Sequence, residues 1–148
     1  MRVFKAMILR ASEADSELFF ELRNASDTVR LSKTKTPITW DDHVHWFKVA
    51  LSCPNYFLYV ASSSKDKIGY VRFHLVNDHA LVSIALKEMY QGKGISKIVL
   101  EKAITELCRS SKLNYIDAEV NKDNIASQRL FNSIGFKKIK EDGDFFIY

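Results

Sequence analysis

The chain has 148 residues, of which 47% are apolar and 27% charged, and its net charge is +4 with a pI near 9.0. This profile is typical of a single globular domain over residues 1–148 and excludes a disordered chain. The lysines and arginines are scattered, so we expect no nucleic-acid partner. We see no apolar run near the ~20 residues of a membrane span and no signal-peptide pattern. Cys53 and Cys108 lack metal-ligand spacing, so we expect reduced thiols, a cytoplasmic location and no metal.

The first half of the chain predicts two helices and four strands. Ser12 and Asp15 form a capping-box-like start for a helix to Asn24. Residues 25–38 are polar and turn-like. Thr39 caps a second helix to about Ser52. The expected strands are 6–10, 56–62, 68–76 and 80–86.

The second half predicts two further helices and three strands. Apolar side chains recur at helical spacing from Ile95 to Cys108. A strand follows at 115–120, and a shorter helix ends at Gly135. Residues 137–141 and 144–148 predict a hairpin around Asp142-Gly143.

The turn between the strand 80–86 and the helix that begins at Ile95 is the most informative segment. A helix start offers unpaired N–H groups and a partial positive charge, and Gly92 and Gly94 let the backbone approach an anion. The spacing does not fit a P-loop, and the position past mid-chain does not fit a dinucleotide fold. We therefore predict a phosphate cradle of another kind, to which Lys93 and Lys97 add charge.

Gln91-Gly-Lys-Gly-Ile-Ser96 resembles the pyrophosphate loop Gln/Arg-x-x-Gly-x-Gly/Ala of the GCN5-related N-acetyltransferases (GNAT), with Ser96 in place of the final small residue. A second block, 121–136, resembles the family segment in which an Asn, a helix and a Gly-Phe pair flank the pantetheine arm. Each block alone also fits an ordinary helix start or capped helix. Both occur in the family's order, so the resemblance implies a single-domain α/β (α+β) GNAT fold. Its mixed, mostly antiparallel sheet would have six to seven strands with about four helices.

The resemblance implies an acyltransferase that uses acetyl-CoA as cosubstrate, with no metal. The acetyl group would pass to a primary amine by direct attack in a ternary complex. The residues implied in coenzyme A binding are Ile84, Ala85, Leu86, Gln91, Gly92, Lys93, Gly94, Ile95, Ser96, Asn121, Asn124, Ser127 and Phe131.

Proton transfer is less well defined by the sequence. His74, Ser83 and Glu119 are the catalytic candidates, although His74 and Glu119 equally fit a packed or solvated strand position. Many family members have a Tyr where this chain has Phe131, which cannot protonate the leaving thiolate. Ser127, Ser133, Tyr90 and water are the open alternatives.

The N-terminal third shapes the acceptor pocket in this family. Here it contains Arg23-Asn24, then Arg30, then His43-Val-His-Trp-Phe47. This pattern resembles the subgroup that acetylates nucleotide-linked amino sugars in pseudaminic-acid-type pathways, with Arg30, His43 and Trp46 as the implied substrate contacts. Trp46 also fits a core position. The alternatives are a protein N-terminal or lysine acetyltransferase, or a non-catalytic acyl-CoA-binding module. We expect no membrane partner, and either a monomer or a homodimer.

Overall fold

The computed structural model describes residues 4–148. Over this range the chain forms eight strands, five α-helices and two 3₁₀ turns, Glu13–Asp15 and Glu88–Tyr90. The strands are β1 Met7–Arg10, β2 Tyr56–Ser62, β3 Lys67–Val76, β4 His79–Leu86, β5 Tyr115–Asp117, β6 Glu119–Asn121, β7 Lys140–Asp142 and β8 Phe145–Ile147. The helices are α1 Ser16–Arg23, α2 Ser26–Arg30, α3 Trp40–Ser52, α4 Ile95–Ser110 and α5 Ile125–Ser133.

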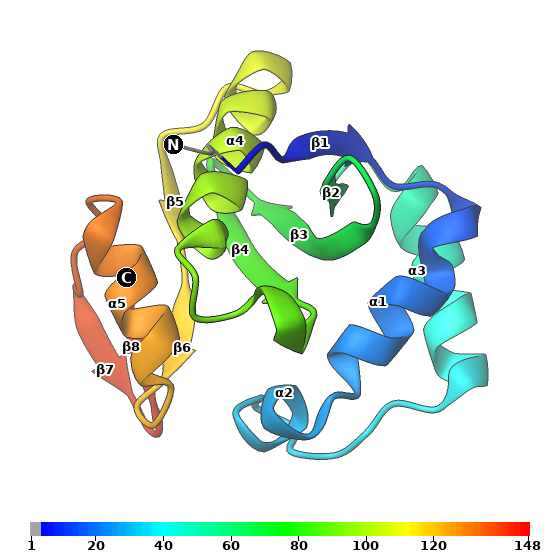
Figure 1. Cartoon of the computed structure of the whole chain (residues 1–148). Coiled ribbons are helices and arrows are strands. Elements are labelled where there is room, and N and C mark those ends of the chain that lie inside the picture. Colours follow the sequence, from blue (N-terminus) through cyan, green and yellow to red (C-terminus); the bar gives the residue numbers. More distant parts are fainter. Residues whose placement is uncertain (1–3) are drawn as a thin grey trace.

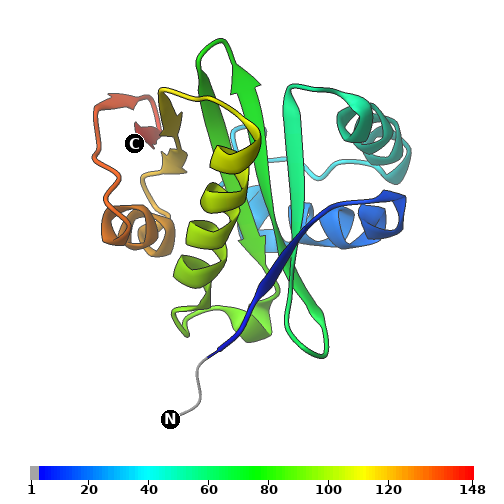
Figure 2. The same ribbon diagram turned by 90° about the horizontal axis from the view of Figure 1, so that it is seen from above.

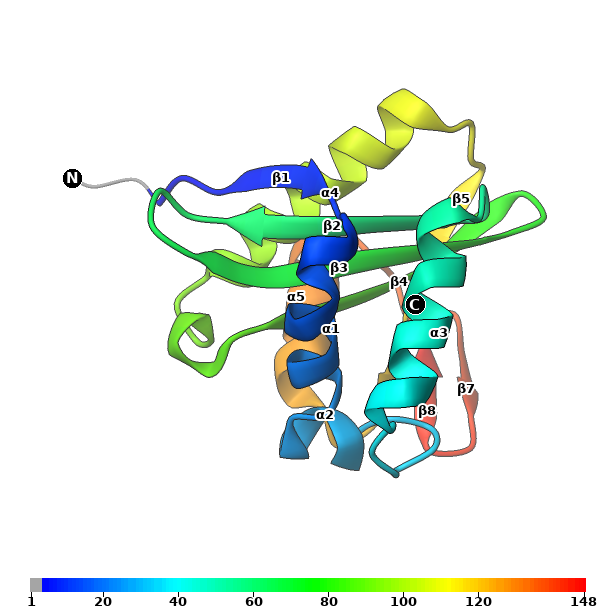
Figure 3. The same cartoon turned by 90° about the vertical axis from the view of Figure 1, so that its right-hand side faces the viewer.

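The first sheet contains five strands in the order β1-β2-β3-β4-β5. Its neighbours are antiparallel except for the parallel pair β4 and β5. Helix α4 packs on one face, and α1 and α3 pack on the other (Figures 2 and 3). The predicted mixed, mostly antiparallel α/β fold is confirmed.

The second sheet has the order β6-β8-β7 and lies beside α5 (Figure 1). The prediction of one continuous strand over 115–120 is therefore wrong. Ala118 exchanges backbone hydrogen bonds with Tyr148, its N–H donating at 3.2 Å and its carbonyl accepting at 2.9 Å. This pairing directs the chain away from β4, so the expected six- to seven-stranded sheet is divided in two.

The turn-like prediction for residues 25–38 missed α2, whose five residues are too short to show an apolar period. The predicted start at Thr39 agrees with α3, whereas Ser12 caps the 3₁₀ turn Glu13–Asp15 that precedes α1. The Ser12 N–H donates to Asp15 Oδ2 at 2.9 Å. Thr39 Oγ1 accepts the Asp42 N–H at 3.2 Å.

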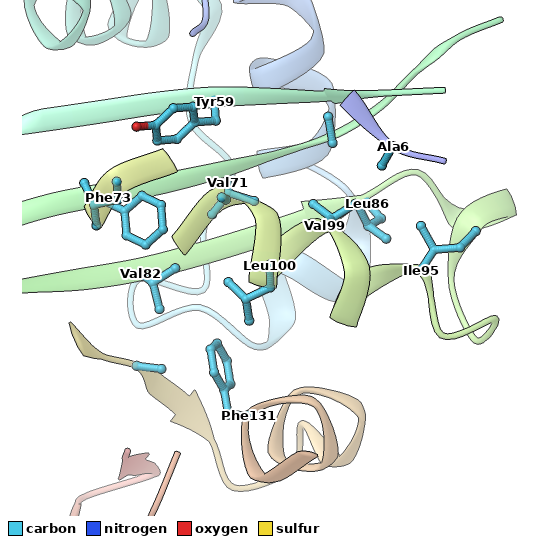
Figure 4. Packing of buried hydrophobic residues seen from close by; sticks show 14 of the residues in the cluster. Ala6, Tyr59, Val71, Phe73, Val82, Leu86, Ile95, Val99, Leu100 and Phe131 are labelled. Carbon is cyan, nitrogen blue, oxygen red and sulfur yellow. The ribbon is translucent and has the colours of Figure 1, made fainter. Parts of the chain in front are cut away.

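Two apolar clusters fill the two faces of the first sheet. The larger lies between this sheet, α4, α5 and the second sheet. Figure 4 shows Phe131 of α5 directed toward Leu100 of α4 in this cluster. The smaller joins α1 and α3 to the opposite face through residues such as Phe19, Phe47 and Tyr70. Within residues 4–148, no helix combines the length and apolar character that a membrane crossing requires.

Candidate functional site

The C-terminal half of β4 has a free backbone edge. The ladder to β5 covers only His79 to Leu81. The Lys87 N–H donates to the Ile68 carbonyl of β3 at 2.9 Å, and successive residues of a strand alternate in hydrogen-bonding direction. The backbone groups of Ile84 and Leu86 therefore point away from β3, whereas those of Ala85 point toward it. Ile84 thus presents a backbone donor at the edge where β4 and β5 separate.

The glycine turn lies directly after this edge. Gly92 and Gly94 have φ values of +72° and +75°, a region that side chains rarely adopt, and a Cβ on either would meet open space. Gln91 ties the turn to β4, because its Nε2 donates to the Leu86 carbonyl at 2.9 Å. The turn is therefore a fixed, open backbone surface.

Helix α4 begins at this turn with its first N–H groups available. Gly94 is the N-cap residue and gives no side-chain cap, and no acidic residue lies in the first turn. Lys93 and Lys97 are exposed, and Ser96 is half-buried. Because the helix dipole and both lysines are positive, this end of α4 suits a phosphate group.

The second predicted block has mainly structural contacts. Asn121 is buried, and its Oδ1 accepts the Asp123 N–H at 2.9 Å. Asn124 caps α5, because its Oδ1 accepts the Ser127 N–H at 3.1 Å. Phe131 is only 3% exposed and packs against Phe136 with ring centroids 5.1 Å apart.

The three catalytic candidates lie in two places. His74 and Ser83 are on adjacent strands and share the sheet face that α1 and α3 cover, since His74 lies opposite Leu81 and Arg72 opposite Ser83. His74 stacks on Tyr56 at a centroid distance of 4.3 Å. Glu119 lies on β6 in the second sheet, where it forms an ion pair with Lys33.

The predicted substrate contacts differ in exposure, although the His43 and Trp46 rings lie only 6.2 Å apart. Trp46 on α3 is partly exposed and faces Tyr56 edge-on, with centroids 6.0 Å apart. Arg30 is an exposed side chain on α2 and lies 3.5 Å from Asp27. His43 is fully buried, and its Nε2 lies 2.8 Å from the Ser16 carbonyl. A ligand cannot reach His43 in this conformation.

The sequence placed Arg23 in the acceptor region but did not predict that it meets a second arginine there. Arg23 of α1 and Arg72 of β3 both lie over the Trp46 ring, each with Cζ 5.4 Å from its centroid. Tyr70, Arg72 and His74 alternate along β3 and therefore share this face. Nothing in the sequence aligned α1 with β3, so the pairing of the two arginines was hidden.

Two shallow surface hollows lie away from the glycine turn. One, of about 400 Å³, is at the C-terminal end of α4 and includes Asp78, Cys108 and Asn114. The other, of about 460 Å³, lies between α4 and β1. Among residues 4–148, no group of three His, Cys, Asp or Glu side chains is arranged to hold a metal ion.

Comparisons with known proteins agree with this geometry. A family model described as an acetyltransferase (GNAT) domain matches residues 6–137. A domain from Methanocaldococcus jannaschii DSM 2661 has 24% identity and a TM-score of 0.85, with 99% of this chain and 97% of that chain covered.

Two further solved structures share the fold at lower identity. Spermidine N-acetyltransferase from Vibrio cholerae, in complex with CoA and spermine, has 16% identity and a TM-score of 0.83, covering 96% of this chain and 91% of its own. An aminoglycoside acetyltransferase in complex with coenzyme A has 14% identity and a TM-score of 0.81, with 97% of this chain and 94% of that chain covered. None of the curated proteins matches this sequence.

Proposed function

The chain belongs to the GNAT family of acetyl-CoA-dependent N-acetyltransferases, and we propose that its acceptor is the primary amine of a nucleotide-linked amino sugar. The observation that carries the transfer site is the free edge of β4 beside the uncapped start of α4. One surface there offers backbone donors, and the adjoining turn offers positive potential. A ligand that contains both a thioester and a diphosphate needs the backbone donors for the first and the positive potential for the second.

The residues present fit acetyl-CoA. The backbone from Gly92 to Ser96 would hold the pyrophosphate, because a Cβ at Gly92 or Gly94 would occupy the open space next to the helix start. The N–H groups of Ile84 and Leu86 would hold the pantetheine arm and the thioester carbonyl. When bound, acetyl-CoA supplies an acetyl group activated as a thioester.

Positioning is the main contribution expected from this chain. Holding two reactants in line contributes about 7–11 kcal/mol to lowering a barrier, and a fixed backbone donor to a developing oxyanion about 3–4 kcal/mol. Acid–base groups add roughly 10²–10⁴-fold in rate. Backbone geometry therefore outweighs any single side chain.

We assign proton removal from the amine to His74, acting with Ser83 through water. Ser83 adjoins Ile84, whereas His74 lies opposite Leu81, three residues or about 10 Å along β4 from Ile84. Direct contact with an amine at Ile84 is too long for His74, and one or more waters would bridge the gap. Glu119 would accept a proton from the opposite side of the opening between β4 and β5.

The leaving thiolate has few possible proton donors. Phe131 has none, the Tyr90 hydroxyl donates to Asp66 at 3.0 Å, and Ser133 Oγ donates to the Leu130 carbonyl at 2.7 Å. Ser127 and water remain as sources. A thiol pKa near ~8.5 makes the thiolate a tolerable leaving group even without a strong acid.

The acceptor class is supported by Trp46 and Arg30, which lie on the side of the sheet where α1, α2 and α3 gather. Trp46 offers a partly exposed ring for a base or sugar, and Arg30 an exposed guanidinium for a phosphate. We do not include His43 among these contacts because it is buried.

Calorimetry with acetyl-CoA, with adenosine as control, tests the site first. We expect binding of acetyl-CoA that depends on the pyrophosphate, and then release of thiol when UDP-linked amino sugars are added. Failure to bind acetyl-CoA would contradict the whole proposal. Binding without turnover on any amino-sugar nucleotide would contradict the acceptor class alone.

A further inference from the structure

Two arginines from different elements meet over one aromatic ring beside the free edge. Arg23 and Arg72 are both half-buried, and each guanidinium lies 5.4 Å from the centroid of Trp46. Arg72 Nη2 also donates to Ser83 Oγ at 3.2 Å. These contacts hold the two cations in place on the sheet face where the acceptor amine would arrive.

This arrangement is electrostatically unfavourable without a counterion. Burial lowers the pKa of Arg23, and the charge of Arg72 lowers it further. Within residues 4–148, none of the ion pairs involves Arg23 or Arg72. The nearby polar groups are the phenols of Tyr56 and Tyr70, and burial raises the pKa of Tyr70. The Tyr70 phenol therefore stays neutral near pH 7 and does not balance the two charges.

The pair is close to the place of reaction. Arg72 lies directly opposite Ser83, and Ser83 immediately precedes Ile84, whose N–H is on the free edge. Residues opposite each other on neighbouring strands have Cβ atoms about 5 Å apart. A group held by Arg72 would therefore sit within one small molecule's length of an amine at the edge.

We infer that the acceptor carries an oxyanionic group, a carboxylate or a phosphate, which Arg23 and Arg72 bind beside the reacting amine. The inference rests on the proposed acetyl transfer and assigns the anionic group of its acceptor, which in a nucleotide-linked sugar is the diphosphate, to these two residues. A planar guanidinium matches both oxyanions with paired hydrogen bonds, and such charge-assisted bonds are the strong ones. The same two cations repel polyamines and other polycationic acceptors.

Matched acceptors test the inference while acetyl-CoA is saturating and thiol release is followed. The matched pairs are glucosamine 6-phosphate with glucosamine, and L-alanine with L-alaninamide. Spermidine and a UDP-linked amino sugar are tested as two further acceptors. In one pair, or for the sugar nucleotide compared with the neutral acceptors, we expect the anionic acceptor to have a kcat/KM at least about tenfold higher. The amide's amine is less basic and so more often unprotonated, which makes the alanine comparison a stringent one. The pair that responds identifies carboxylate or phosphate as the source.

Variants separate binding of the anion from other effects. Arg23→Gln leaves the Arg72–Ser83 hydrogen bond in place, and it should lower kcat/KM for the preferred anionic acceptor by about 10–100-fold and for its neutral partner by less than about threefold. Arg10→Gln is the control, because Arg10 makes a similar contact, 4.5 Å over the Phe57 ring, but on β1. Coenzyme A affinity, measured by calorimetry, should not change in either variant. With coenzyme A saturating, inorganic phosphate should raise the melting temperature of the wild type more than that of Arg23→Gln.

The inference is overturned if spermidine or a neutral amine is the best acceptor, or if Arg23→Gln slows anionic and neutral acceptors equally. Either result leaves the acetyl transfer itself standing. If coenzyme A binds but none of the acceptors in the panel leads to thiol release, both the proposed function and this inference are contradicted.

Discussion

Gly94 combines two properties that no other residue type offers at the start of α4. Its φ of +75° lies in the left-handed region, and its missing side chain leaves open the space beside the first helical N–H groups. Left-handed backbone costs other residues about 1 kcal/mol or more, and Asp tolerates it best among charged residues. An acidic substitution can therefore separate folding from anion binding.

We expect Gly94→Asp to lower coenzyme A affinity at least about tenfold, because its carboxylate would lie where the pyrophosphate is proposed to bind. Stability should fall by only about 1 kcal/mol. Gly143→Asp is the matched control, since Gly143 has a φ of +57° and open space in the β7–β8 turn. Calorimetry and thermal unfolding of both variants check this. Equal coenzyme A affinity in the two would argue against a pyrophosphate site at the turn.

His43 is a fully buried histidine between α1 and α3, where it packs against Phe20 and Phe47 with centroid distances of 5.4 Å each. Burial lowers its pKa, the hydrogen bond to Ser16 raises it by less, and Arg23 lowers it further. The folded state therefore binds a proton at His43 less readily than the unfolded chain does.

This shift gives the stability a pH dependence of known sign. Because the folded pKa is depressed, the contribution of neutral His43 is present above the unfolded pKa of about 6.5 and is lost as pH falls below it. We expect the free energy of unfolding to fall more steeply, by up to about 1.4 kcal/mol per pH unit, in the wild type than in His43→Gln between about pH 6.5 and 5. Urea unfolding at several pH values measures this, with the exposed His45→Gln as control. Parallel curves for wild type and His43→Gln would contradict the assignment.

At the scale of single elements, β3 and β4 meet closely at Gly69. A Cβ there would collide with the Ala85 carbonyl oxygen and the Leu86 side chain. Gly69 lies opposite Leu86 in the ladder, so its missing side chain lets the end of β4 pack closely against β3.

Gly69→Ala should therefore displace β4 at the proposed pantetheine contacts. We expect a loss of about 1–3 kcal/mol in stability from overpacking and a measurable loss of coenzyme A affinity. Gly143→Ala, which meets no neighbour within 4 Å, should leave coenzyme A binding unchanged. If Gly69→Ala lost stability but bound coenzyme A normally, the edge near Leu86 would not be part of the cofactor site.

Elements with strong local signals could be predicted from the sequence. The strand Tyr56–Ser62 and the start of α4 at Ile95 agree with the expected bounds, because apolar alternation and glycine turns are local properties. The break at Ala118 could not be predicted, since its cause is a hydrogen-bonded partner 30 residues away, Tyr148.

The same distinction separates the cofactor and acceptor sides of the candidate site. The glycine turn is one contiguous segment, so its open backbone follows from the sequence. The meeting of Arg23, Trp46 and Arg72 joins α1, α3 and β3 and depends on helix packing. For the same reason His43 was expected near a ligand but lies in the core.

At the scale of the whole molecule, the candidate site lies where the two sheets separate. Ala118 leaves the first sheet and pairs with Tyr148, while β4 continues without β5 beyond Leu81. Tyr148 is 5% exposed and lies in the same apolar cluster as Phe131, Val120 and Leu100. The second sheet is thus held in its separated position both by backbone hydrogen bonds and by a shared core (Figure 1).

Replacing the Tyr148 side chain with a methyl group should therefore lower both the stability of the fold and the affinity for coenzyme A. We expect Tyr148→Ala to lower the free energy of unfolding by about 3–5 kcal/mol, as for other buried aromatic residues. Its coenzyme A affinity should fall even at temperatures where the variant remains folded, because the second sheet loses its anchor. Tyr115→Ala is the control on β5, where the ring is 50% exposed and stacks on His79, and should cost little of either quantity. Denaturant unfolding and calorimetry at low temperature measure both. Normal affinity in folded Tyr148→Ala would mean that β4 and α4 alone form the cofactor site and that the second sheet contributes only to stability.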